Sequence, residues 1–152
     1  MKGKIIFFGL VLFFVVGFAT AQSKVPQSII SRTALVKKYH TKPELENLQK
    51  GPLLELYIER IKVLVKTLPY IALVTKPGVT LTDLGIPDDA TNSKALTAQA
   101  DSMSSFLDVT VEFQRKMCPY ADKGNLISAI LFYEDTKVFK NVRRKLETVM
   151  LN

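Results

Sequence analysis

Apolar residues cover most of the circumference of a helix predicted for residues 53–74. Four of the five charged residues ahead of Pro69 recur at spacings of four, three and four, so they share one narrow stripe. These four are Glu55, Glu59, Lys62 and Lys66. Because the rest of the surface is aliphatic or aromatic, neighbours should enclose this helix on most sides. Pro69 cannot donate a backbone hydrogen bond, which predicts a kink or a helix end there.

Two further segments have helical periodicity. Residues 92–117 carry an apolar stripe that Phe106 and Phe113 broaden, and we expect this stripe to belong to the core. Its members are Leu96, Ala100, Met103, Leu107, Thr110, Gln114 and Met117. Residues 126–150 predict a last helix, whose first half is apolar nearly all round and whose second half is amphipathic.

Two short helices are expected before the long ones. Ser28 can cap a helix that reaches about Tyr39, and Thr41 with Glu44 fits a capping box for a second helix that reaches about Gln49. The predicted fold is therefore all-α. It is an up-down bundle of three long helices, near 53–74, 92–117 and 126–150, with one or two short N-terminal helices.

The N-terminus has the pattern of a cleavable signal peptide. Lys2 and Lys4 precede the apolar residues 5–18, and Ala19-Thr20-Ala21 is a small-x-small cleavage site. We expect cleavage after Ala21, a single domain at residues 22–152, and export to the periplasm or the exterior. The alternative is an uncleaved membrane anchor, because residues 5–21 are uncharged and close to the shortest span of a bilayer.

Charge and cysteine content narrow the classes of partner. Loss of Lys2 and Lys4 lowers the formal net charge from +7 to +5, which is short of the charge of a dedicated nucleic-acid binder. Cys118 is the only cysteine, so no intramolecular disulfide can form and packing must supply the stability.

Residues able to carry out catalysis are sparse. His40 is the only histidine, and we expect it on an exposed turn. The chain has no His-Glu-x-x-His, Cys-x-x-Cys or Gly-x-Ser-x-Gly motif and no phosphate-binding glycine loop. These observations predict a non-enzymatic protein without a metal or cofactor. A weaker alternative is an enzyme that uses loop carboxylates, although Asp88 and Asp89 are better explained as negative charge at the start of the following helix.

The leading functional hypothesis is an interaction module that binds a protein or an anionic envelope or extracellular surface. Its first candidate surface is a basic run near the C-terminus, which is alternatively a solvated helix face. This run consists of Lys137, Lys140, Arg143, Arg144 and Lys145.

The alternative hypothesis is a carrier of an apolar small molecule or lipid. Its cavity would lie between the kinked central helix and its neighbours. The predicted lining is Tyr57, Ile61, Leu68, Met103, Phe106 and Leu131.

Overall fold

The computed structural model describes residues 26–136, and this part of the chain is mostly helical with no β-strand. The predicted signal segment and the basic run both lie outside the described residues. The α-helices are α2 (Lys42–Glu46), α3 (Lys50–Thr67), α4 (Ala90–Met117) and α5 (Lys123–Asp135). Three short 3-10 turns are η1 (Leu68–Tyr70), η2 (Thr82–Leu84) and η3 (Cys118–Tyr120).

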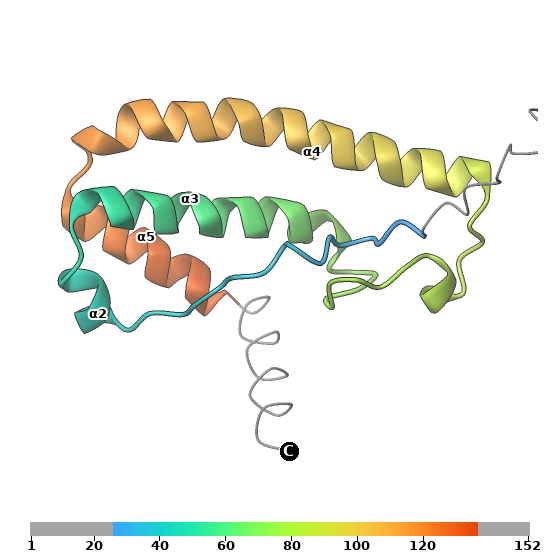
Figure 1. Ribbon diagram of the computed structural model, residues 1–152, viewed down its shortest axis with the longest axis horizontal. Coiled ribbons are helices and arrows are strands. Elements are labelled where there is room, and N and C mark those ends of the chain that lie inside the picture. Colours follow the sequence, from blue (N-terminus) through green and yellow to red (C-terminus); the bar gives the residue numbers. More distant parts are fainter. Residues whose placement is uncertain (1–25, 137–152) are drawn as a thin grey trace, which may run out of the picture.

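Helix α3 lies at the centre of the described structure. Figure 1 shows α4 running antiparallel along one side of α3, with α5 against another side. The prediction that neighbours enclose this helix on most sides is confirmed, because only Glu55 and Lys62 are exposed between Leu53 and Thr67. The buried residues of α3 are spread along its length. They are Leu53, Ile58, Arg60, Ile61, Val63 and Thr67.

The ends of α3 differ from the prediction. The helix begins at Lys50, so Gly51 and Pro52 lie in its first turn, where a proline costs no intrahelical hydrogen bond. It ends at Thr67, whose hydroxyl donates to the carbonyl of Val63 at 2.7 Å. The predicted break at Pro69 is confirmed, whereas the predicted continuation to residue 74 is wrong, because η1 and a turn follow.

The predicted helix over residues 28–39 is also wrong. This segment is extended and bent, and it pairs with the loop at residues 78–80. The backbone N–H of Ile29 donates to the carbonyl of Val79 at 2.8 Å, and Gly78 donates to Ile30 at 2.9 Å. Pairing with a distant loop therefore satisfies backbone groups that a local helix would otherwise have satisfied.

Local capping predictions are confirmed for two helices. The carboxylate of Glu44 accepts hydrogen bonds from the Thr41 N–H at 2.7 Å and from the Thr41 hydroxyl at 3.0 Å. These bonds, together with Lys38, lower the pKa of Glu44 from 4.5 to about 2. Asp89 caps α4 by accepting from the N–H of Asn92 at 2.8 Å.

Helix α5 is shorter than the predicted last helix. It starts at Lys123 and ends at Asp135, because Thr136 has a ψ of 143°, outside the helical region. The prediction of a continuous helix over residues 126–150 is therefore wrong, because the helix ends before Thr136. The predicted helix is apolar nearly all round in its first half, and α5 buries Leu126, Ile127 and Ile130 there.

Candidate interaction surface

Helix α4 presents a row of large apolar side chains to solvent. Phe106, Val109, Phe113 and Met117 have exposed fractions of 57%, 71%, 53% and 53%. Spacings of three, four and four place them on one side of the helix, and we call them the α4 row. Although α4 has 28 residues, it buries only Leu96 and Leu107.

The α4 row lies beside the side of the helix that packs on α3. Phe106 precedes the buried Leu107 by one residue, which rotates its side chain by about 100° around the helix axis. The prediction that Phe106 and Phe113 broaden the core stripe is therefore wrong. Among the described helices, α3 is the main neighbour of α4, and one neighbour covers only one side.

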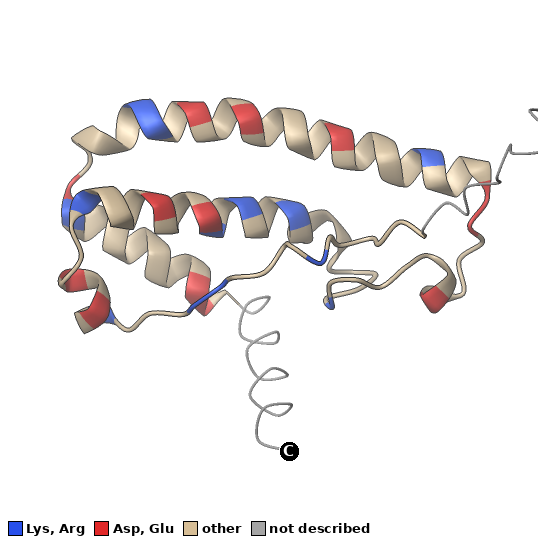
Figure 2. Cartoon of the chain, in the orientation of Figure 1, with Lys and Arg blue, Asp and Glu red and all other residues tan. Residues whose placement is uncertain are grey.

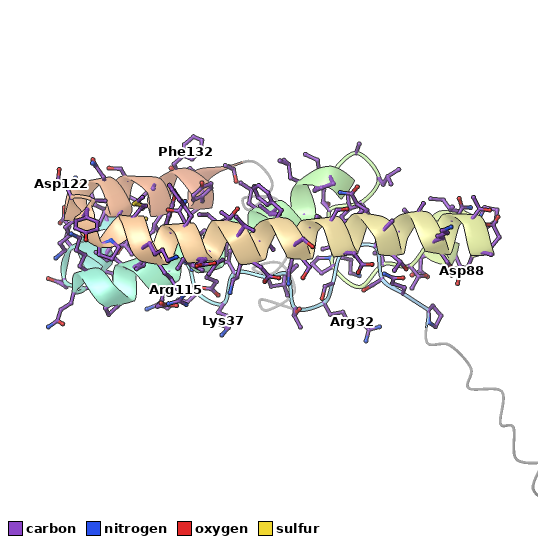
Figure 3. All side chains as sticks on the ribbon, turned by 90° about the horizontal axis from the view of Figure 1, so that it is seen from above. Arg32, Lys37, Asp88, Arg115, Asp122 and Phe132 are labelled. Atoms are coloured by element: carbon purple, nitrogen blue, oxygen red, sulfur yellow. The ribbon has the colours of Figure 1, made fainter. Side chains whose placement is uncertain are left out.

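Phe132 of α5 points to the same side of the molecule as the α4 row. Figure 3 shows Arg115 and Lys37 on one side and Phe132 on the opposite side. Met117 follows Arg115 by two residues, about 200° around the axis, so it faces away from Arg115. Phe132 is 68% exposed. We call the α4 row together with Phe132 the apolar face.

Charged residues lie on other sides of α4. The guanidinium of Arg115 donates to both carboxylate oxygens of Glu55, at 2.5 and 2.9 Å, which ties the end of α4 to α3. Lys116 pairs with Glu112 within the helix at 2.7 Å. Figure 2 shows the basic positions near the two ends of α4 and the acidic positions between them. The charged residues of α4 therefore lie beside the α4 row and not within it.

A fully buried arginine fixes the end of α5. The Nη2 of Arg60 donates to Oε1 of Glu134 at 2.6 Å, and its Nε donates to the same oxygen at 3.2 Å. Its Nη1 donates to Glu59 at 2.6 Å, and Nη2 also donates to the carbonyl of Lys38 at 2.5 Å. Arg60 and Glu134 are 0% and 4% exposed, so each neutralises the other in the interior.

His40 completes this buried group, which contradicts its predicted place on an exposed turn. Its backbone N–H donates to Oε2 of Glu134 at 3.1 Å, and its Nδ1 lies 3.3 Å from Nη2 of Arg60. The side chain of His40 is only 11% exposed. We call Arg60, Glu134 and His40 the buried ionic group.

Sequence reasoning did not identify the buried ionic group, although one feature pointed to it. Among the charged residues between Leu53 and Pro69, Arg60 alone lies off the stripe of Glu55, Glu59, Lys62 and Lys66. A charge among apolar positions needs a buried partner of opposite charge. Nothing in the local sequence identifies Glu134 as that partner, because it lies 74 residues away.

The residues of the predicted ligand cavity are spread over several places. Tyr57 and Leu131 pack against the same core cluster, and Ile61 is buried. Leu68 and Phe106 are exposed. Met103 packs against a second cluster, with Tyr70 and Leu96. The structure thus brings Tyr57 and Leu131 to one cluster and Met103 to another.

Cys118 is a packed residue of the core. It is buried in the cluster beneath α5, and its thiol donates to Oε1 of Gln114 at 2.9 Å. Burial raises the pKa of this thiol, which keeps it protonated and poorly nucleophilic.

Within residues 26–136, no group of three or more His, Cys, Asp or Glu side chains is placed to hold a metal ion. No helix in this same part of the chain is both long and apolar enough to cross a membrane. Comparison of the chain with protein-family models, curated proteins and solved structures finds no match.

Proposed function

We propose that the chain is an exported, non-enzymatic interaction module that binds an amphipathic helix of a partner protein through the apolar face. The α4 row carries this proposal. Single exposed apolar residues are ordinary on a protein surface, whereas an aligned set on one helix is characteristic of a docking site. Their spacing of three and four suits packing against another helix.

The dimensions of the apolar face suit a helical partner. Phe106 and Met117 are eleven residues apart, which is about 16 Å along the helix axis at 1.5 Å per residue. About three turns of a partner helix would match that length. Phe132 of α5 points to the same side of the molecule and would add an aromatic contact with a partner that extends past α4. Its contact side would carry aliphatic or aromatic residues at the same spacing.

The wider proposal keeps the organisation that the sequence indicates. Residues 1–21 are removed on export to the periplasm or the exterior, and α3, α4 and α5 belong to an up-down bundle within residues 22–152. The alternating directions of α3 and α4 support the bundle (Figure 1). The basic run from Lys137 to Lys145 provides a second contact, with an anionic surface.

Site-specific photo-crosslinking tests the apolar face directly. We would place p-benzoylphenylalanine at Phe106 or Phe113 of the full chain, in cells that export it. Asp108 provides a matched control position, because it is exposed on the same helix and lies off the α4 row. We expect one partner protein to crosslink from positions 106 and 113 but not from 108. Peptide mapping should place the crosslink in an amphipathic helix of that partner.

Two other occupants of the apolar face would produce different crosslinks. A crosslink to residues 137–152 of the same chain would mean that the C-terminal segment covers the face. A crosslink between two copies would mean self-association. Either result, or equal crosslinking from position 108, overturns the proposal.

A further inference from the structure

A pocket of about 380 Å³ lies between the first described residues, the end of α3 and the first half of α4. In Figure 1 the N-terminal segment passes beside the end of α3 and beneath this part of α4. The apolar residues Leu96, Ala100 and Met103 of α4 form one wall of the pocket. Polar groups come from Ser28, from Lys66 of α3 and from Tyr70 of η1.

Tyr70 has a buried hydroxyl with no hydrogen-bond partner among the described residues. The residue is only 6% exposed, and desolvation raises the pKa of its phenol, which therefore stays protonated as a donor. Buried hydroxyl groups in proteins nearly always have a partner. Less than 1 Å² of this hydroxyl is accessible, so an acceptor in the pocket reaches it only if the Tyr70 side chain shifts. Such a shift would give the hydroxyl the partner that it lacks.

Lys66 provides an independent indication of a ligand. It is half-buried at the pocket wall, and it forms no ion pair or hydrogen bond with the described part of the chain. By contrast, the buried Arg60, six residues earlier in α3, forms ion pairs with both Glu59 and Glu134. A half-buried ammonium without a carboxylate partner attracts an anion.

We propose that this pocket binds a small organic carboxylate with an aliphatic body, of the medium-chain fatty acid class. The carboxylate pairs with the ammonium of Lys66, and a shift of the Tyr70 side chain allows its hydroxyl to donate a hydrogen bond to the same carboxylate. The aliphatic body lies against Leu96, Ala100 and Met103. A single cation with apolar walls suits a singly charged carboxylate better than a polyphosphate, which needs several cations or a cradle of backbone N–H groups.

Calorimetric titration of the exported chain with decanoate tests the proposal. Decanol is the matched neutral probe, and we expect decanoate to bind with a stoichiometry of one and far more tightly than decanol. Lys66→Met should weaken decanoate binding by about tenfold, because a charge-assisted contact is lost. Lys62→Met is the matched control, because it removes a charge from the same stripe outside the pocket, and it should leave the affinity unchanged.

Tyr70→Phe separates ligand recognition from folding. Removal of an unpartnered buried hydroxyl should leave the melting temperature unchanged or raise it, while the affinity for decanoate falls by about threefold or more. Filling the pocket with Ala100→Leu should also weaken binding. The proposal is overturned by absence of saturable binding, by equal affinity for decanol, or by Lys66→Met binding as tightly as Lys62→Met. Unchanged affinity in Tyr70→Phe would likewise contradict it.

Discussion

Helices α3 and α4 both carry many apolar residues, but most of those of α3 are buried or half-buried and several of those of α4 are exposed. Helix α3 has 18 residues and buries six of them, including a charged one, whereas α4 has 28 residues and buries two. The difference lies in their neighbours: α3 contacts α4, α5 and η3, while α4 packs mainly on α3. Whether an apolar side chain is buried or exposed therefore depends on how many other elements pack around its helix. We expect α3 to set the stability and α4 to make external contacts.

The largest expected effect comes from the buried charge of α3. Arg60→Met leaves Glu134 buried without its partner, which should lower the free energy of unfolding by about 3–5 kcal/mol. Urea denaturation followed by circular dichroism measures this. The matched variant on α4 is Arg115→Met, which breaks an exposed pair and should cost about 0–1 kcal/mol. An equal loss of unfolding free energy in Arg60→Met and Arg115→Met would contradict the expected difference between α3 and α4.

A double variant checks the cause of that loss. If the unpaired carboxylate is responsible, replacing both partners with apolar residues, Arg60→Met with Glu134→Leu, should restore most of the stability. A double variant as unstable as Arg60→Met alone would mean that the hydrogen bonds to Lys38 and Glu59 dominate instead.

The next effect compares apolar truncations on the two helices. Ile58 of α3 is 2% exposed, so Ile58→Ala should lower the free energy of unfolding by about 2–5 kcal/mol through lost burial and a new cavity. Phe113 of α4 is 53% exposed, and Phe113→Ala should change it by only about 0.5 kcal/mol. The same denaturation measurement serves both variants. A large loss from Phe113→Ala would show that another part of the chain covers the apolar face.

Helix caps should matter more for α4 than for α3. Asp89→Ala removes the side-chain cap of α4 and should cost about 1 kcal/mol. Gln49 at the start of α3 makes no side-chain cap, so Gln49→Ala should change stability by only a few tenths of a kcal/mol, roughly. Amide hydrogen exchange in the first turn of each helix would show where fraying occurs. Fraying of both first turns to the same extent would contradict the prediction.

The smallest effect concerns Glu44, which starts the short helix α2. Its pKa is lowered to about 2 in the folded chain from 4.5, so its contribution is complete above pH 4.5 and is lost as the pH falls toward 2. Glu44→Gln should therefore lower the midpoint of urea denaturation near neutral pH and change it little near the folded-state pKa of about 2. A difference between the two proteins that stays constant across this range would rule out the carboxylate as the cause.

The sequence by itself determined the features that depend on residues within about one helical turn. The caps at Thr41 and Asp89, the break at Pro69 and the charge stripe of α3 all follow from neighbours three or four residues away. Position and approximate length of α3 and α4 follow from the same periodicity. These features were predictable because helix formation satisfies backbone groups locally.

Only the tertiary structure decided which apolar residues are covered. Phe106 and Phe113 have the pattern of core residues, yet no described element lies over them, and the segment at residues 28–39 is extended because it pairs with the distant residues 78–80. Likewise, Arg60 finds Glu134 across 74 residues. Periodicity fixes which side of a helix a residue occupies, but burial depends on what the rest of the chain places against that side.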